Sequence, residues 1–190
     1  MSSLAKVARA LAALPDRKAV TRFDETAERY FDAHLRGRAP LDLLMYAASA
    51  AGEHSMVWLA VSGLEGWRSS RSWKPLGRAA AALGAESVLV NGLVKSGFRR
   101  PRPERSEPAP LPLRTPRTSS FPSGHASAAF FAAALLRDSP AWPVYYALAA
   151  VVATSRVHVR THYASDVVAG AALGAVLGEL ARPLAAIRDK

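Results

Sequence analysis

Five apolar segments of helical length recur between residues 41 and 184, separated by prolines, glycines and charged residues. They are rich in alanine, leucine and valine without alternating β-branched runs, and alanine loses no side-chain entropy in a helix. A chain of 190 residues holds one domain with a core and is short for two. We therefore expect an all-α protein with a single helical bundle. The segments cover residues 41–64, 76–94, 123–136, 141–155 and 162–184.

Two features inside these segments predict how they pack. The triplet Gly-Glu-His at residues 52–54 interrupts the first segment, so its two halves need not form one continuous helix. Gly170, Gly174 and Gly178 recur every fourth residue in the last segment. Such a stripe of small residues lets two helices approach closely, as they do in membranes.

The sequence favours a membrane bundle over a soluble one. A clean span needs about twenty apolar residues, and no segment is both that long and free of charge, with a mean hydropathy of +0.04 for the chain. The glycine stripe, the all-round apolarity of residues 141–154 and the basic turns nevertheless point to lipid. We expect residues 39–185 to form five or six transmembrane helices, the number depending on whether residues 41–52 span.

The two ends of the chain are expected to lie outside this bundle. Residues 1–14 place apolar side chains at helical spacing and residues 22–35 form a charged amphipathic segment. We expect residues 1–38 to be amphipathic helices on a membrane surface, and a frayed soluble helix is the alternative for residues 1–14. Residues 186–190 are expected to be a polar tail.

The charge balance points to an anionic partner. There are 25 basic and 15 acidic residues, a net charge of +10, which suits nucleic acid, an anionic membrane or a phosphorylated molecule. Arginines crowd residues 99–117, but no aromatic platform or reading helix accompanies them, which argues against nucleic acid. The absence of cysteine excludes disulfides, thiolate metal sites and a cysteine nucleophile.

Residues 122–125 place chemistry at the start of an apolar helix. Helix starts expose unpaired backbone N–H groups and receive anions. Ser123 can cap the helix or donate a hydrogen bond, Gly124 lets the backbone approach a ligand, and His125 can exchange a proton near neutral pH. A capped helix with a chance histidine is the alternative.

His162 and Asp166 are four residues apart at the start of the last apolar segment, which would put them on one helical face. A carboxylate there can hold one ring nitrogen and present the other as a base or nucleophile. A helix-start ion pair is the alternative. Lys95 and the arginines after it can bind phosphate oxygens, or they can form a solvated or membrane-surface face.

Taken in order, these segments read K-x6-R-P, P-S-G-H and S-R-x5-H-x3-D. They resemble the signature of the type-2 phosphatidic acid phosphatase superfamily, which also includes bacterial acid phosphatases and vanadium haloperoxidases. The match is strict over residues 95–166, and every signature position is present. The matching residues are Lys95, Arg102 and Pro103, then residues 122–125, then Ser155, Arg156, His162 and Asp166.

The resemblance implies roles for these residues. His162 is expected to attack phosphorus with Asp166 orienting it, and His125 to protonate the leaving oxygen and later to activate water. No metal and no cofactor are expected, because cations and backbone amides can neutralise the phosphoryl group. The groups expected to hold the phosphoryl oxygens are Lys95, Arg102, Ser123, the Gly124 amide and Arg156.

The resemblance further implies an integral-membrane phosphatase in a bacterial plasma membrane, with its site on the extracytoplasmic side. Its substrate is expected to be a lipid phosphate monoester or diphosphate of the polyprenyl or phosphatidyl type. The alternatives are a soluble broad-specificity acid phosphatase, a vanadate-dependent haloperoxidase and an anion-binding membrane module with a decayed site. Nothing in the sequence indicates an oligomeric state.

Several residues outside the motifs receive expectations of their own. Those expected to steer phosphate or to lie on the surface are Arg99, Arg100, His158 and Arg160. Glu53 is expected to form a buried polar pair with the neighbouring His54.

Overall fold

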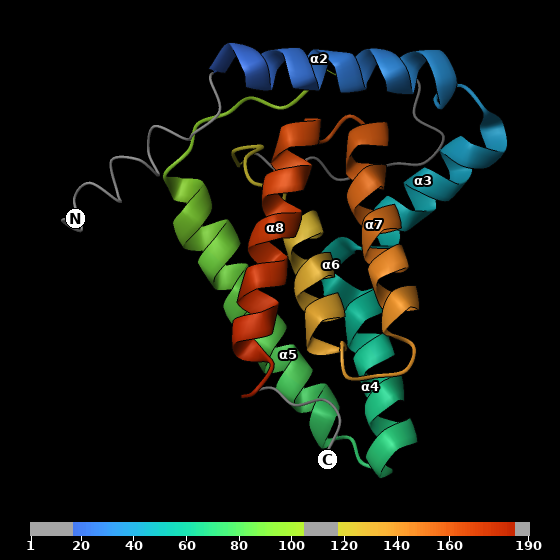
Figure 1. The fold of residues 1–190 in the computed structure, drawn as a ribbon, viewed down its shortest axis with the longest axis vertical. Coiled ribbons are helices and arrows are strands. Elements are labelled where there is room, and N and C mark those ends of the chain that lie inside the picture. The colour runs from blue at the N-terminus through green and yellow to red at the C-terminus, as the bar shows by residue number, and fades with distance from the viewer. Residues whose placement is uncertain (1–16, 105–117, 185–190) are drawn as a thin grey trace, which may run out of the picture.

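The computed structural model describes residues 17–104 and 118–184, and these two ranges contain helices and no strand (Figure 1). The all-α prediction is therefore confirmed. Expectations for residues 1–14, 105–117 and 186–190 lie outside the described residues. The helices are α2 (Arg17–His34), α3 (Ala39–Ala51), the 3-10 helix η1 (Glu53–Ser55), α4 (Met56–Ser70), α5 (Lys74–Ser87), the π-helix η2 (Val88–Val94), α6 (Gly124–Leu135), α7 (Trp142–His158) and α8 (Ala164–Ala181).

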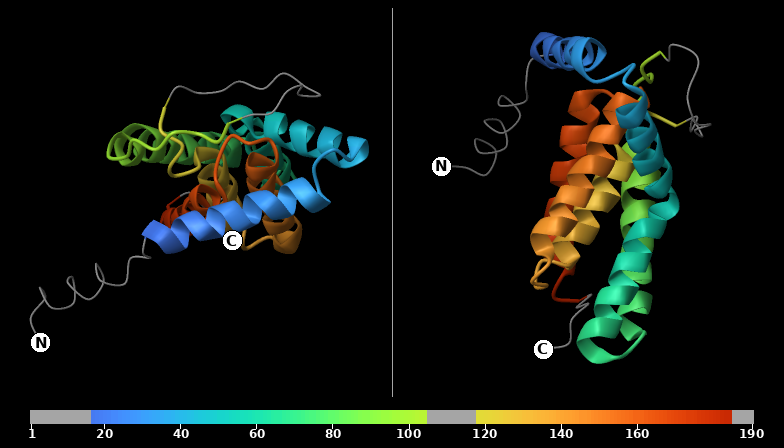
Figure 2. Two further views of the ribbon diagram at one scale, coloured as in Figure 1. Left: turned by 90° about the horizontal axis from the view of Figure 1, so that it is seen from above. Right: turned by 90° about the vertical axis from the view of Figure 1, so that its right-hand side faces the viewer.

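Helix α6 lies at the centre of the bundle, packed against α7 and α8, with α5 on a further side (Figure 1). Figure 2 shows α3, α4 and α5 as a second layer beside the α6–α8 layer. Between the layers, Trp58, Phe131 and Tyr145 pack into the main hydrophobic core. Helix α2 crosses one end of the bundle, above the start of α8 and the end of α7. That end carries the motif residues.

Local sequence explains where several helices begin. A proline occupies one of the first two positions of α3, α5 and α7, where its missing N–H would have no helical partner. The predicted break at residues 52–54 is confirmed: α3 ends at Ala51, η1 follows, and Ser55 adopts a left-handed backbone conformation with φ of 58°. Figure 1 shows that the chain changes direction between α3 and α4.

The predicted start of the last helix is wrong. Helix α8 begins at Ala164 rather than at His162, so His162 and Asp166 do not share a helical face. Two interactions account for this. The Tyr163 N–H donates to Asp166 Oδ2 at 3.0 Å, so the carboxylate caps the helix start. The His162 N–H turns back to the Arg156 carbonyl at 3.2 Å.

Among the described residues, one helix is long and apolar enough to cross a membrane, judged by its length and composition. It is α8, with a mean hydropathy of 1.4 over its 18 residues. Helix α6 is apolar but has only 12 residues. The expectation of five or six transmembrane helices is therefore not confirmed by helix length and hydropathy.

The glycine stripe of α8 does permit close helix packing, as predicted. A Cβ atom built on Gly174 would lie 2.8 Å from Ser127 Cα of α6, and one built on Gly178 would lie 3.1 Å from Phe131 Cα. A distance of 2.8 Å is shorter than real Cβ contacts, and 3.1 Å is tighter than most of them. The contact between α6 and α8 therefore depends on the absence of side chains along this line.

We predict that Gly174→Ala lowers the free energy of unfolding by about 1–3 kcal/mol, because the added methyl group meets α6 backbone that has no room to move. Gly84→Ala on α5 is the matched control, since a Cβ there has nothing within 4 Å and alanine is the better helix former. Thermal unfolding in detergent measures both. Equal melting temperatures for the two variants would contradict the packing argument.

Candidate active site

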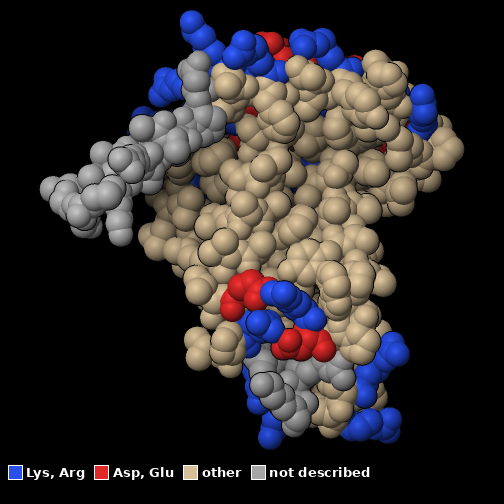
Figure 3. All heavy atoms as spheres, in the orientation of Figure 1, with Lys and Arg blue, Asp and Glu red and all other residues tan. Residues whose placement is uncertain are grey.

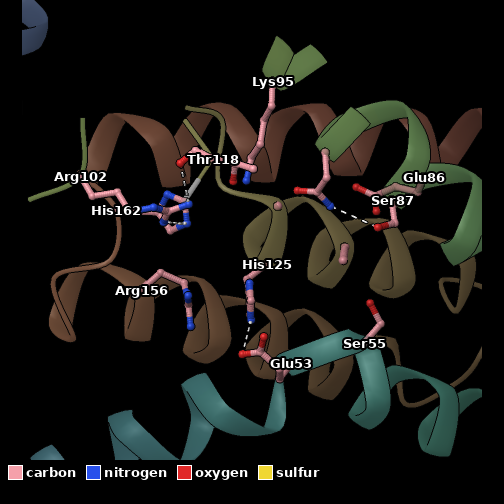
Figure 4. A pocket seen from close by; sticks show the side chains of 14 residues that line it. Glu53, Ser55, Glu86, Ser87, Lys95, Arg102, Thr118, His125, Arg156 and His162 are labelled. Carbon is pink, nitrogen blue, oxygen red and sulfur yellow. Dashed lines mark hydrogen bonds and ion pairs between the residues drawn. The ribbon is translucent and has the colours of Figure 1, made fainter. Parts of the chain in front are cut away.

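The motif residues meet at a cavity of about 310 Å³ between η1, the α5–η2 segment, α6, α7 and the loop before α8 (Figure 4). Six of the eight predicted site residues line it, while Ser123 and Asp166 lie behind the wall. The six come from segments far apart in the chain. They are Lys95, Arg102, Gly124, His125, Arg156 and His162.

His162 has a backbone carbonyl and its predicted carboxylate partner on the same ring nitrogen. Its Nδ1 lies 2.7 Å from the Ser120 carbonyl oxygen, and because a carbonyl only accepts, Nδ1 carries the hydrogen. Asp166 Oδ2 is 3.7 Å from the same nitrogen, an ion-pair distance beyond hydrogen-bond length. In the neutral ring, Nε2 then keeps its lone pair, and it lies 3.3 Å from Arg102 Nη1.

The surroundings of His162 favour its neutral form. Burial, together with the positive charges of Arg102, Arg156 and Lys95, lowers the pKa of His162 to about 4, although Asp166 acts in the opposite direction. The side chain is only 2% exposed. The imidazole is therefore a neutral ring with an available nitrogen over the whole neutral range.

Asp166 is buried and organises the chain around His162. Its Oδ1 accepts from Arg100 Nη1 at 2.6 Å, and its backbone carbonyl accepts from the Ser123 N–H at 2.9 Å. Asp166 thus links the start of α8 to the start of α6 through its backbone carbonyl, and to the segment after η2 through its carboxylate. It stabilises positive charge near His162 without a direct hydrogen bond to the ring.

Arg100 was expected to steer phosphate or to lie on the surface, and the structure corrects this. Its guanidinium bridges Asp166 and Asp24 of α2, with 2.6 Å to a carboxylate oxygen of each. It also lies over the Tyr163 ring, 4.2 Å from the centroid. The two carboxylates raise the pKa of Arg100. Arg100 is a partly buried connector between α2 and the start of α8.

Asp24 is a site-supporting residue that sequence reasoning missed. It is 6% exposed, and its carboxylate accepts from both the backbone N–H and the hydroxyl of Ser165, each at 2.8 Å. The two residues are 141 positions apart in the chain. No pattern of neighbouring residues in the sequence predicts this contact. An acidic residue on the buried side of α2 does indicate, however, that α2 packs against charged groups.

Three cations surround the cavity. Lys95 follows η2 and is 7% exposed, while Arg156 is 1% exposed and donates from Nη1 to the Ser49 hydroxyl. Arg102 is held by the Thr161 carbonyl at 2.8 Å from Nη1. The two guanidinium groups fixed in this way offer donors to an anion without further reorganisation, and the buried Lys95 ammonium adds a third positive charge.

The predicted cap of α6 is confirmed. Ser123 precedes the helix, and its Oγ accepts from the Ala126 N–H at 3.4 Å. The side chain is fully buried and does not line the cavity. Gly124 does line it, and a Cβ there would lie 3.1 Å from Asn91 Cγ. The absence of a side chain at Gly124 therefore leaves room at the helix start.

His125 faces Glu53 across the cavity (Figure 4). Its Nε2 lies 3.7 Å from Glu53 Oε2, and Nε2 has no hydrogen-bond partner among residues 17–104 and 118–184. Glu53 was expected to pair with its sequence neighbour, so this contact is a second feature that the sequence did not predict.

His158 and Arg160 are not phosphate-steering or surface groups. His158 is 3% exposed, with Nε2 2.7 Å from Asp42 Oδ1 of α3. Arg160 donates to Glu28 at 2.7 Å and to Asp32 at 2.6 Å, so it anchors α2. His158 thus holds α3, and Arg160 holds α2, against the end of α7.

The cavity brings together two histidines, which can exchange protons, and three cations, which can bind an anion such as phosphate. Residues 75–186 match the family model of the PAP2 superfamily, and the chain belongs to that superfamily. The resemblance drawn from the three motifs is thereby confirmed, and with it the class of enzyme, a phosphatase.

Two relatives and one solved structure illustrate the match. A decaprenylphosphoryl-5-phosphoribose phosphatase of Mycobacterium tuberculosis is 36% identical over 132 residues, covering 68% of this chain and 72% of the relative. A lipid A 1-phosphatase of Porphyromonas gingivalis is 34% identical over 134 residues, 66% of this chain and 27% of the relative. The fold is that of a transmembrane PAP2-type phosphatidylglycerolphosphate phosphatase from Bacillus subtilis, with a TM-score of 0.70, 23% identity and coverage of 91% and 89%.

We predict that protonation of His162 destabilises the folded chain in acid. The unfolded ring takes up a proton near pH 6.5, whereas the folded ring resists it until about pH 4. The free energy of unfolding should therefore fall as the pH drops from 6.5 to 4, by about 3 kcal/mol more than in a chain without this ring. Melting curves of the wild type and of His162→Gln across this range measure the difference. His34→Gln, at an exposed histidine, should retain the wild-type slope; identical slopes for all three proteins would contradict the prediction.

We also predict that Asp24→Asn lowers both stability and turnover, because Arg100 and Ser165 lose a charged partner. Losing hydrogen bonds to a charged group costs about 1.5–3 kcal/mol, and the displaced Arg100 should reduce turnover about tenfold through Asp166. Melting temperature and phosphate release are measured. Glu25→Gln is the matched control, since Glu25 is exposed and its ion pair with Arg29 spans 4.0 Å. If both variants behaved alike, Asp24 would have no special role.

Proposed function

We propose that this chain is an integral-membrane phosphatase that hydrolyses a lipid phosphate through a phospho-histidine intermediate at His162. The observation that carries the proposal is the state of that ring: Nδ1 donates to the Ser120 carbonyl, so Nε2 keeps its lone pair at a cavity lined by Lys95, Arg102 and Arg156, with Arg102 Nη1 3.3 Å away. A fixed nucleophile beside fixed cations is what phosphoryl transfer requires.

In the first step, His162 Nε2 forms a bond to phosphorus while the bond from phosphorus to the leaving oxygen breaks. His125 supplies the proton that the leaving oxygen takes up, so the lipid alcohol departs neutral. Asp166, with 3.7 Å from Oδ2 to His162 Nδ1, stabilises the positive charge that develops on the ring. The Ser120 carbonyl keeps the ring in its productive orientation.

In the second step, water attacks phosphorus and gives its proton to His125, while the bond between phosphorus and Nε2 breaks. Inorganic phosphate leaves and both histidines return to their starting states. Lys95, Arg102 and Arg156 hold the equatorial oxygens in both steps, together with the Gly124 N–H at the start of α6. Ser123 was expected to bind phosphate as well, but its buried side chain instead supports that helix start through its cap.

The distribution of charge supports a membrane location. On the face seen in Figure 3, the middle of the bundle carries no Lys, Arg, Asp or Glu, while charged side chains gather at its two ends. Large apolar side chains are exposed along the outer helices, including Leu44, Leu64, Val144 and Val176. We infer that α3 with α4, α5 with η2, and α6 to α8 form five membrane crossings within residues 39–185.

Helix α2 fits a place on the membrane surface, as expected for residues 1–38. It runs across the site end of the bundle, with Phe23 and Tyr30 exposed on it. At the opposite end, the turn between α4 and α5 exposes Arg68, Arg71 and Lys74. The positive-inside rule favours the cytoplasm for such a turn, and we therefore place the cavity on the extracytoplasmic side of the plasma membrane.

The substrate class follows from the relatives and from this placement. The named relatives act on phosphate groups of decaprenylphosphoryl-phosphoribose and lipid A. We propose a lipid phosphate monoester or diphosphate of the polyprenyl or phosphatidyl type, because a cavity at the membrane surface receives a headgroup whose chain remains in lipid.

The test uses purified protein in detergent with phosphatidyl, polyprenyl and sugar-linked polyprenyl phosphates, scored by released phosphate. We predict turnover of at least one lipid phosphate in the presence of a chelator, a phosphoryl label on the wild type, and loss of both in His162→Ala by about a thousandfold or more. His34→Ala, at an exposed histidine of α2, should retain activity.

Two outcomes would overturn the proposal. Normal turnover by His162→Ala would exclude the nucleophile. Recovery of the protein in a salt-washed soluble fraction without detergent would exclude the membrane location and favour a soluble phosphatase.

A further inference from the structure

We propose that Glu53 is a positioning residue for His125, holding its ring and stabilising the proton that His125 gives to the leaving oxygen. This rests on the proposed function, in which His125 is the acid. Glu53 lies outside the three motifs that define the superfamily resemblance, and it reaches the cavity from the break between α3 and α4.

The break in the helix brings Glu53 to the imidazole. Gly52 ends α3 and lies against the ring: a Cβ built there would be 3.1 Å from His125 Cδ2 and 2.9 Å from Val152 Cγ1. With no side chain at Gly52, the one-turn helix η1 approaches α6, and Glu53 Oε2 comes within 3.7 Å of His125 Nε2. A continuous α-helix from α3 into α4 would lack this turn.

The distance suits an acid that must release its proton. At 3.7 Å a carboxylate stabilises an imidazolium by its charge, but it does not take up the N–H in a hydrogen bond. Nε2 has no hydrogen-bond partner within the described ranges. When His125 is protonated, its Nε2–H is therefore stabilised and still available to a leaving oxygen.

The charges around the cavity give this carboxylate its importance. Lys95, Arg102 and Arg156 hold a phosphate, but they also oppose a positive charge on His125. Glu86, the other carboxylate that lines the cavity, accepts a hydrogen bond from the Ser127 hydroxyl. Glu53 is thus the acidic side chain placed to offset the cations at His125. Its side chain is 28% exposed, so it remains in contact with the cavity.

The test compares Glu53→Gln with the wild type on two soluble monoesters, p-nitrophenyl phosphate and a short-chain alkyl phosphate. The aryl leaving group needs no proton, whereas the alkyl group does. We expect kcat for the alkyl ester to fall about 10- to 100-fold and kcat for the aryl ester to change less than about threefold. A loss of packing alone would reduce both equally, and that result would overturn the proposal.

A double-mutant cycle with His125→Ala tests whether Glu53 acts through the histidine. If it does, adding Glu53→Gln to His125→Ala should reduce alkyl turnover less than about twofold further. Independent, multiplicative losses would contradict the inference. Glu53→Asp, which retains the charge, should keep more alkyl activity than Glu53→Gln, and it provides a second variant if the glutamine protein does not fold.

Glu179→Gln is the matched control, because it removes a carboxylate at the far end of α8, where Glu179 pairs with Arg137; it should behave as the wild type on both esters. The two proposals fail in different ways. A wild type that releases no phosphate from any ester contradicts the proposed function. An active wild type with an unaffected Glu53→Gln contradicts only the role of Glu53.

Discussion

The guanidinium of Arg100 is the connection on which the site end of this structure depends. It binds Asp24 of α2 and Asp166 of α8, each at 2.6 Å. Its backbone carbonyl accepts from the Ser120 N–H at 3.0 Å, and the Ser120 carbonyl in turn accepts from His162. One arginine therefore connects α2, the start of α8 and the segment that orients His162. Without the Arg100 guanidinium, the buried carboxylates of Asp24 and Asp166 would lose the positive charge that they share.

Close packing of α6 against α8 provides the rigid base for this network. The glycines of α8 let the α6 backbone approach, and the Ser123 N–H reaches the Asp166 carbonyl at 2.9 Å. The starts of α6 and α8 thus lie side by side at one end of the bundle, with His125 on one and His162 just before the other. A phosphate between them would meet exposed N–H groups as well as fixed cations.

Sequence reasoning was most successful where chemistry is local. The cap at Ser123 and the break at residues 52–54 both depend on neighbouring residues. It failed at His162, because four-residue spacing suggested one helix while the chain before Ala164 turns back to the Arg156 carbonyl. It also treated Arg100, His158 and Arg160 as phosphate-steering or surface groups, because an arginine or histidine in a sequence does not reveal which distant carboxylate it meets.

The sequence by itself determined the helical class, the order of the apolar segments and the identity of the two histidines and three cations that meet at one cavity. Composition, periodicity and motif spacing are properties of the sequence itself, and they specify which reactive and charged side chains are present. Only the tertiary structure decided which partner each group receives: the Ser120 carbonyl for His162, Asp24 and Asp166 for Arg100, and Glu53 for His125. The physical reason is that every residue has a backbone carbonyl, so the sequence does not indicate which of them a side chain contacts. Charges far apart in the chain become partners only when packing brings them within a few ångströms.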